Sequence, residues 1–322
     1  MKRTIIFISI VVMLCAGWTV GWYFVEGQVV TAIDRSKAGL SDRGHMLECI
    51  DQETGGYPFR FSLQCERISY INQNSGLTFQ ANALRTAAQI YQPNKVVAEL
   101  DGPATLRTPT GRQIDLGWDS LRSSAKFDIS GAERTSVHAR ELEVLDIARN
   151  QTIRIDDFQF HGRKEGENNL RVALFAQNVV SIKQLWPDFD LNAEVLLQNA
   201  HAALMRRPDI VALGRLDGLD GELKSMSYAS GESSMIEIAG PFTIDKKGIL
   251  TGTFNVKLID GERILADLSG ALPDRRDLLF KIGQVLKLAT AETNGVVSVT
   301  IVVKDGNAFL GFIPLGTIGP LF

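Results

Sequence analysis

The sequence predicts a mainly β (α+β) protein, in which an N-terminal transmembrane helix is followed by an antiparallel, twisted, meander-like β-sheet body with a few helices. Three observations lead to this fold class. The N-terminus carries a long uncharged run, many later segments alternate apolar with polar residues, and Asp-Gly turns separate several of those segments. With 322 residues, 45% of them hydrophobic, the chain is long enough to bury a large core in one or two domains.

The uncharged run covers residues 4–25 and follows the basic pair Lys2 and Arg3. Its length fits a membrane-spanning helix, which needs ~20 apolar residues. Aromatic residues gather from Trp18 onward, as they do where a span reaches the headgroups. The positive-inside rule predicts a cytoplasmic N-terminus and an exported body. The alternative is a cleaved signal peptide, but its apolar region would be shorter and would end in a small-x-small site.

We therefore expect a single-pass inner-membrane protein with an uncleaved anchor over residues 1–25, a helical linker over 26–48 and a periplasmic body over 49–322. The body offers a possible join between two lobes near 181–230, where prolines and glycines gather. A helix is predicted to begin after Asp274, and the apolar stretch 191–205 favours a helix over a strand.

Two of the three cysteines, Cys49 and Cys65, lie in the exported part, whereas Cys15 falls within the span. An oxidising compartment such as the periplasm makes the exported pair a disulfide candidate. Two unpaired buried cysteines are the alternative. A metal site is not expected, because two thiols without nearby histidines supply half of a ligand set.

The first predicted strand lies between these cysteines. Phe59, Phe61, Leu63 and Cys65 alternate with polar residues, and the segment 55–58 forms the turn that leads into them. The same period of two recurs at 96–100, 114–118, 170–176, 236–238, 250–258, 297–303 and 309–315, and Asp305-Gly306 predicts a hairpin between the last two segments.

The sequence contains no catalytic signature: there is no G-x-S-x-G, H-E-x-x-H, C-x-x-C, Walker or G-x-G-x-x-G motif. We expect a protein that is not an enzyme and has no cofactor. The best metal candidate is the segment with Asp156, Asp157 and His161, where Asp157 and His161 would share a strand face with Gln159. A solvated strand edge is favoured, because no second histidine is near. The 34 basic and 37 acidic residues give a net charge of −3, so nucleic acid is not an expected partner.

An apolar sheet face has to be covered by a second layer, close on itself or hold an apolar ligand. For an exported, membrane-anchored sheet we predict binding of lipid, with phospholipid as the candidate, and a role in envelope maintenance. A closed sandwich core is the alternative for the same residues. A scaffold that recruits other envelope proteins and a periplasmic hydrolase are rival functions. The candidate lining residues are Leu250, Phe254, Val256, Val299, Ile301 and Phe309.

Two short motifs resemble an uncharacterised family of membrane-anchored envelope proteins in Gram-negative bacteria, a domain of unknown function. The first pattern is a cysteine, a Gly-aromatic-Pro-Phe-Arg turn and a second cysteine. The second is a strand followed by Gly-x-Ile-Pro and a terminal Pro-Leu with an aromatic tip. The layout also resembles the AsmA-like group, which implies long twisted sheets and phospholipid transport or outer-membrane homeostasis. The residues that match are Cys49, Gly56, Tyr57, Pro58, Phe59, Arg60 and Cys65, then Asp305, Gly306, Gly311, Ile313, Pro314, Pro320, Leu321 and Phe322.

Overall fold

The computed structural model describes residues 2–129, 131–183, 186–201, 218–231, 234–271, 279, 283 and 296–321. Within these residues the chain forms a long N-terminal helix and twenty strands, and every strand pair with a described register is antiparallel. The predicted fold class, mainly β behind an N-terminal helix, is confirmed. The contacts divide the chain into two units, Met1–Ser124 with Asp146–Ala148 and Ala125–Leu145 with Arg149–Phe322. The predicted join near 181–230 lies inside the second unit.

Helix α1 (Lys2–Ser41) is continuous, so the segment predicted as a linker forms part of the same helix as the apolar run. The helix ends before Gly44, which adopts the left-handed conformation (φ 81°) that often follows a helix. Cys49 therefore lies in a strand rather than near the end of the helix. The helix is long and apolar enough to cross a membrane, as a membrane anchor or a signal sequence is.

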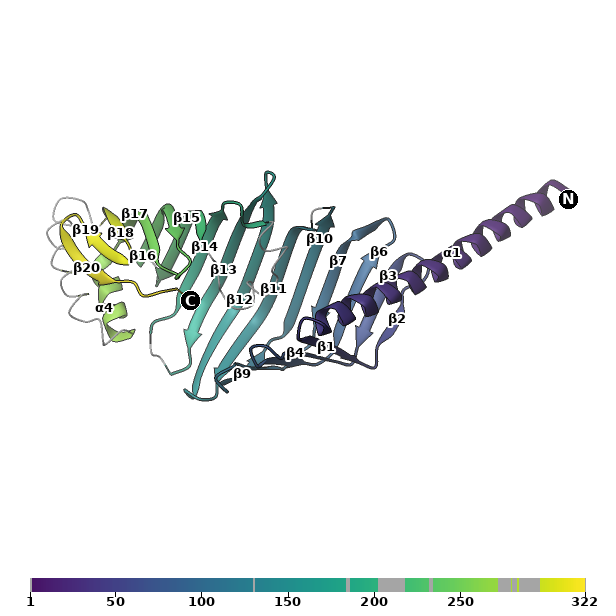
Figure 1. Ribbon diagram of the computed structural model, residues 1–322, viewed down its shortest axis with the longest axis horizontal. Helices are drawn as coiled ribbons and strands as arrows, with labels where there is room; N and C mark the ends of the chain where they lie inside the picture. The colour runs from purple at the N-terminus through teal and green to yellow at the C-terminus, as the bar shows by residue number, and fades with distance from the viewer. Residues whose placement is uncertain are drawn as a thin grey trace. The chain divides into compact units, whose positions relative to one another are not determined.

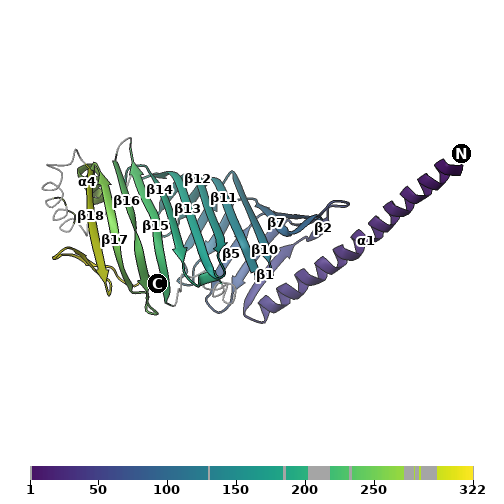
Figure 2. The ribbon, with the colours of Figure 1, turned by 90° about the horizontal axis from the view of Figure 1, so that it is seen from above.

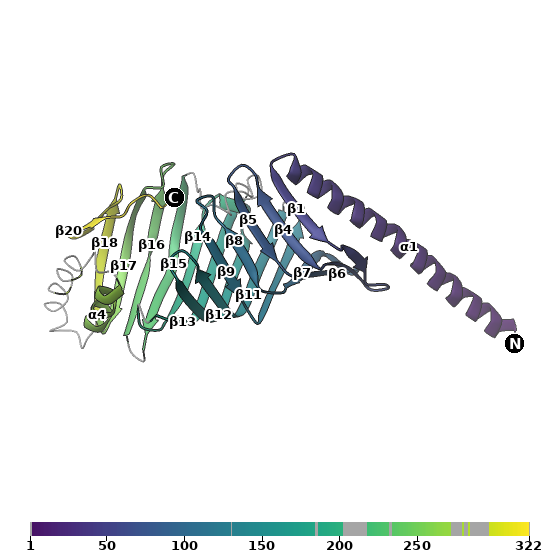
Figure 3. The same ribbon diagram turned by 90° about the horizontal axis from the view of Figure 1, so that it is seen from below.

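The first unit is built from two ladders of strands. The first ladder runs in the order β1 (His45–Ile50), β4 (Arg67–Asn72), β5 (Leu77–Ala81), β8 (Ala104–Arg107) and β9 (Gln113–Gly117), and Figure 3 shows these strands side by side. The second ladder, visible in Figure 1, runs in the order β2 (Glu53–Gly55), β3 (Arg60–Cys65), β6 (Leu84–Gln89), β7 (Gln92–Leu100) and β10 (Ser120–Asp128).

The chain passes from one ladder to the other at five corners: 51–52, Glu66, 82–83, 101–103 and 118–119. Small residues beside these corners are buried, with Cys65, Ala81 and Ala104 each 3% exposed. Backbone hydrogen bonds join neighbouring corners, as when the Asp101 N–H donates to the Ala83 carbonyl over 2.8 Å. The repeated corner aligns the two ladders along one line.

The second unit is a run of long strands that pair in sequence order. Figure 2 shows them side by side. Each strand from β12 to β20 pairs antiparallel with the next one, with register shifts in β13–β14, β14–β15, β15–β16 and β19–β20. The bounds are β11 (Gly131–Asp146), β12 (Gln151–Glu165), β13 (Asn169–Ser181), β14 (Phe189–Leu197), β15 (Leu219–Ser230), β16 (Ser234–Ile244), β17 (Leu250–Ile259), β18 (Val296–Lys304), β19 (Asn307–Leu310) and β20 (Ile313–Thr317).

Helix α4 (Gly261–Ala271) packs on β16 and closes a compact core (Figure 1). Its Ile264 is fully buried, against Val256 and Leu258 of β17 and Val297 of β18. Four buried apolar side chains at one site are a substantial contribution to stability, because each is worth roughly 1.5–3 kcal/mol relative to exposure.

Two predicted elements differ from the structure, and a third lies largely outside the described residues. The stretch 191–205 was predicted to favour a helix, but its first part is strand β14. The segment 309–315 is two short strands, β19 and β20, with a turn at Gly311 and Phe312. The helix predicted after Asp274 lies largely outside the described residues. By contrast, every other predicted strand is present, and Asp305 and Gly306 form the predicted hairpin with positive φ at both residues.

Candidate functional site

One face of the second unit is apolar across seven consecutive strands. In an antiparallel sheet, directly paired residues lie on the same face, so the register assigns each side chain to a side. We call this surface the apolar face. Its two central rows, in order from β12 to β18, are Phe158, Ala176, Leu191, Tyr228, Ile236, Leu258 and Val297, and Phe160, Leu174, Ala193, Met226, Ile238, Val256 and Val299.

Burial divides the apolar face into two parts. At β16–β18, under α4, Val256, Leu258 and Val297 are 5–9% exposed, so this part is closed core. Over β12–β15, most of the apolar side chains are only half-buried, including Phe160, Leu191 and Met226. The half-buried part keeps apolar area that a ligand or a covering segment would remove from water.

Five of the six predicted lining residues lie on the apolar face at its α4 end, and the sixth lies on the opposite face. Val256 is in the closed core, and Phe254, Val299 and Ile301 pack against it. Leu250 lies on the same face, paired with the buried Ile244. Phe309 is paired with Val302 and therefore projects from the opposite face. The predicted set is thus mainly core at the α4 end, and Phe309 does not line it.

The residues that sequence reasoning missed are those of β12–β15. Their signal was present, because Leu191, Ala193 and Val195 alternate with polar residues. The helix interpretation of 191–205 concealed it.

The opposite face of the second unit is mainly polar, with a few apolar side chains such as Phe175 among the polar ones. On β11 and β12, His138 Nε2 donates to Asp157 over 2.6 Å, Gln159 donates to the same carboxylate over 2.7 Å, and His161 Nε2 donates to the Gln159 oxygen over 3.3 Å. Asp157, Gln159 and His161 therefore share one face of the strand, as predicted, and their side chains are linked in a chain of hydrogen bonds. No group of three or more metal-ligating side chains is found among the described residues.

Asp157 is electrostatically stabilised in its charged form. Burial acts to raise its pKa, but hydrogen bonds from His138 and Gln159 and the charges of His138 and Arg140 outweigh burial and hold the pKa below its ordinary value. Farther along the same face, Arg171 bonds both Glu165 and Glu194, which lowers the pKa of Glu165 and raises that of Arg171. The charges of Arg171, Glu165 and Glu194 are therefore paired with one another.

A shallow depression of about 480 Å³ also lies on the polar face, over β15–β18. Small side chains such as Ser227 and Ala239 form its floor, and Lys257, which is 3.4 Å from Glu237, lies at its edge. Its charges are paired and exposed, so it lacks the convergent buried polar groups that mark a small-molecule site.

The two ladders of the first unit also present apolar faces. On the first ladder, Leu47, Tyr70, Phe79, Leu106 and Ile114 form one row, and all five are half-buried. On the second ladder, Phe61, Ala88 and Val96 form a row of the same kind. The Cys49–Cys65 disulfide joins these faces, with Cα atoms 5.2 Å apart, so the apolar sides meet at the line of corners.

The predicted Gly56-Tyr57-Pro58-Phe59-Arg60 turn packs against helix α1. The Trp18 indole donates to the Pro58 carbonyl over 3.2 Å, and the Thr19 and Tyr57 hydroxyls are 2.7 Å apart. Trp22, which is 4% exposed, stacks on Phe61 at 5.4 Å and meets the Tyr57 ring edge-on at 5.5 Å. This motif therefore fixes the helix to the second ladder.

The other end of the chain is less enclosed. Pro314 lies in the short strand β20 opposite Phe309, where a missing N–H is tolerated at a sheet edge. Pro320 follows β20, and the next residue, Leu321, donates its N–H to the Gly248 carbonyl over 3.0 Å. The motif thus returns the chain to the turn between β16 and β17.

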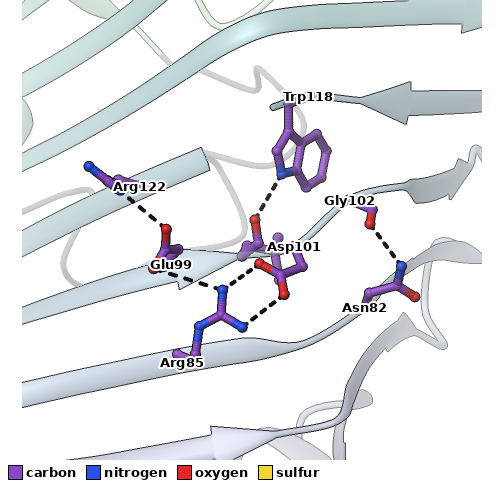
Figure 4. A network of polar contacts seen from close by, with 8 residues as sticks. Asn82, Arg85, Glu99, Asp101, Gly102, Trp118 and Arg122 are labelled. Carbon is purple, nitrogen blue, oxygen red and sulfur yellow. Dashed lines mark hydrogen bonds and ion pairs between the residues drawn. The ribbon is translucent and has the colours of Figure 1, made fainter. Parts of the chain in front are cut away.

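A polar network holds the corners of the first unit on their outer side (Figure 4). Arg85 makes two hydrogen bonds to Asp101 at 2.8 and 2.5 Å, and Glu99 lies between Arg85 and Arg122. The Trp118 indole donates to the Leu100 carbonyl, and Asn82 donates to that of Gly102, each over 2.8 Å. The charged side chains are at least two-fifths exposed, so each pair is worth ~0.2–1 kcal/mol and serves alignment more than catalysis.

A family model described as an uncharacterized protein conserved in bacteria (DUF2125) matches residues 22–319. The chain belongs to the DUF2125 family. The DUF2125 match begins at Trp22 and so includes the part of α1 that packs on Phe61, the disulfide, both ladders and the apolar face. No curated protein matches the chain. The resemblance to an uncharacterised bacterial family is confirmed at this level.

Two features of the chain indicate where this DUF2125 protein is located. The N-terminal apolar helix of this DUF2125 protein is a membrane anchor or a signal sequence, and the disulfide is typical of an oxidising compartment. Together they indicate an envelope or secreted location.

Proposed function

We propose that this DUF2125 protein is a single-pass inner-membrane protein whose body lies in the periplasm and binds phospholipid acyl chains on the half-buried part of the apolar face, over β12–β15. The single observation that carries the proposal is the unbroken pair of apolar rows across these strands, opposite a face that carries most of the polar side chains. Acyl chains are the occupant that such a face suits, because it is wide, apolar and free of charge along its central rows.

The retained anchor is supported by the contact between α1 and the first unit. Trp22 is almost fully buried among rings of the folded body, so the end of the apolar run is part of the fold. Removal of a signal sequence that includes Trp22 would leave Phe61 and Tyr57 without this partner. Lys2 and Arg3 place the N-terminus in the cytoplasm by the positive-inside rule.

The resemblance in layout to the AsmA-like group points the same way. That group implies phospholipid transport or outer-membrane homeostasis, and an open row of long strands behind an inner-membrane anchor fits envelope lipid handling. A scaffold that recruits other envelope proteins through the same face is the rival, and it predicts co-purifying protein in place of lipid.

The test is native mass spectrometry and lipid extraction of the full chain, purified in mild detergent, for wild type and two neighbouring variants of β15. Met226→Lys places an ammonium on the apolar face, and Ser227→Lys places the same group on the polar face, opposite Glu237. We expect near-stoichiometric phospholipid on wild type and Ser227→Lys, and about tenfold less on Met226→Lys, since an unpaired charge is costly in an apolar site.

Equal occupancy of the two lysine variants would contradict binding on the apolar face. Wild-type chains without lipid would contradict lipid binding altogether. Retention of the Cys49–Cys65 disulfide, read from the same spectra as a loss of two hydrogens, controls for folding of each variant.

A further inference from the structure

Exposed aromatic side chains gather at one end of the first unit. Trp18 of α1 is 47% exposed, Tyr57 and Phe59 of the β2–β3 turn are 46% and 68% exposed, and Tyr91 of the β6–β7 turn is 71% exposed. We call these four residues the aromatic end. Large apolar rings left in contact with water are costly, and a group of them on separate segments marks an interaction surface.

The three segments are tied together by hydrogen bonds. The indole of Trp18 donates to the carbonyl of Pro58, and the backbone N–H of Ile90 donates to the carbonyl of Phe59 over 3.0 Å. The turn that carries Tyr57 and Phe59 thus lies between the helix and the turn that carries Tyr91. Exposed Arg60 follows Phe59 directly and adds a cation to this end.

The aromatic end is held at a fixed level along α1. Trp22 is buried against Phe61 and Tyr57, and Tyr23 stacks on Tyr57 at 6.1 Å, so the contact covers the stretch from Trp18 to Tyr23. On the N-terminal side of this stretch, the helix surface is apolar and open, with Phe7 67% and Met13 76% exposed. Those side chains fit hydrocarbon, and the stretch from Trp18 to Tyr23 falls where the span leaves it.

We infer that the aromatic end is embedded in the headgroup region of the membrane, so that the tips of the β2–β3 and β6–β7 turns dip into the phospholipid surface beside the helix. This inference rests on the membrane anchoring in the proposed function. Tyrosine and tryptophan rings favour this zone because one end of each is apolar and the other forms hydrogen bonds, and a nearby arginine suits lipid phosphate. The partner is the phospholipid bilayer itself.

The test uses the full chain with Cys15→Ser, so that one introduced cysteine carries an environment-sensitive fluorophore. Phe59→Cys and Tyr91→Cys place the label at the aromatic end, and Thr110→Cys places it in the exposed β8–β9 turn of the same unit as a matched control. Each labelled protein is reconstituted into vesicles of phosphatidylethanolamine and phosphatidylglycerol, with or without lipid that carries a spin label near its glycerol backbone.

We expect the spin-labelled lipid to quench labels 59 and 91 by about twofold or more and to leave label 110 unchanged, because only side chains at headgroup depth contact the spin label. Since the two labels lie on different turns, a variant that disturbs one turn leaves the other as a readout, and the intact disulfide reports folding. Vesicle-bound chains whose labels 59 and 91 are quenched no more than label 110 would overturn this inference alone. Chains that fail to sediment with vesicles would overturn the anchoring and the inference together. Lipid occupancy of the apolar face is measured separately and is independent of both.

Discussion

Trp22 connects the membrane-type helix to the folded body. Its ring lies within 5.1–5.5 Å of the rings of Tyr23, Tyr57 and Phe61, and only 4% of it is exposed. Such aromatic contacts add ~0.5–1.5 kcal/mol each beyond the burial of area. Trp18, one turn earlier, is nearly half-exposed and makes one hydrogen bond to the β2–β3 turn. Trp22 is therefore expected to contribute much more than Trp18 to the stability of the folded protein.

Replacing Trp22 with alanine is expected to lower the free energy of unfolding by about 3–5 kcal/mol, because it leaves a cavity between α1 and the second ladder. Trp18→Ala, the matched control, removes one exposed hydrogen bond and is expected to lower it by about 1 kcal/mol. Urea unfolding of the full chain in mild detergent, followed by near-UV circular dichroism, measures both. Equal losses for the two variants would show that Trp22 does not fix the helix to the body.

Asp157 links pH to stability. Its pKa in the folded protein lies below its ordinary value, so its stabilising contribution is present above pH ~4 and is lost as the pH falls through the folded pKa. Glu165 acts in the same direction. Wild type is therefore expected to lose thermal stability between about pH 5 and pH 3. Asp157→Asn is expected to flatten this decrease, whereas Asp188→Asn, a change at an exposed carboxylate, is not. A pH profile of the unfolding temperature for the three proteins decides the matter; an unchanged slope in Asp157→Asn would refute the assignment.

At the scale of elements, the disulfide has a role that the sequence did not reveal. Cys49 lies in β1 of the first ladder and Cys65 ends β3 of the second ladder, so their bond ties the two ladders together beside the first corner. The sequence predicted a helical linker over residues 26–48, which would place Cys49 directly after a helix. Strand β1 was missing from that prediction because the short segment His45–Ile50 follows helical spacing too closely to be told apart.

The double variant Cys49→Ser and Cys65→Ser is expected to lower the free energy of unfolding by ~3 kcal/mol, since the bond closes a loop of 16 residues in the unfolded chain. Cys15→Ser removes the free cysteine and is expected to have no effect. Thermal unfolding with and without reductant compares the three proteins, and reductant is expected to destabilise only those that keep the bond. A stable double variant would show that the corners align the ladders unaided.

Most strands could be predicted from the sequence, but the face of the sheet on which each side chain lies was harder to predict. Segments such as 250–258 and 297–303 alternate strictly, and each is a strand with its even or odd positions buried. For 191–205, alanine and leucine favour a helix locally, yet pairing with β13 and β15 makes residues 191–197 a strand. Phe309 was misplaced for a different reason. The two-residue hairpin at Asp305-Gly306 pairs Val303 with Ala308, so even positions in β19 share the face of odd positions in β18. The exchange of strands between two ladders has no local signal in the sequence.

At the scale of the whole molecule, the chain combines a membrane-type helix, a disulfide-linked pair of ladders and a broad sheet with one polar and one apolar face. The polar clusters of β11–β14 satisfy themselves through internal hydrogen bonds and ion pairs, and the apolar face of the same strands is the feature in need of a partner. Near-neutral charge, with a net value of −3, agrees with a partner recognised by apolar contact. This is why we propose binding of lipid for this DUF2125 protein.

The most direct measurement is photo-crosslinking in cells with a photoreactive amino acid placed at successive positions of the sheet. Leu191, Ala193 and Met226 lie on the apolar face, and their neighbours Asn192 and Ser227 lie on the polar face. We expect phospholipid adducts at the first three positions and none at the other two, a period of two that follows the strands. Adducts to lipid at every position, at none, or to protein on the apolar face would contradict this expectation.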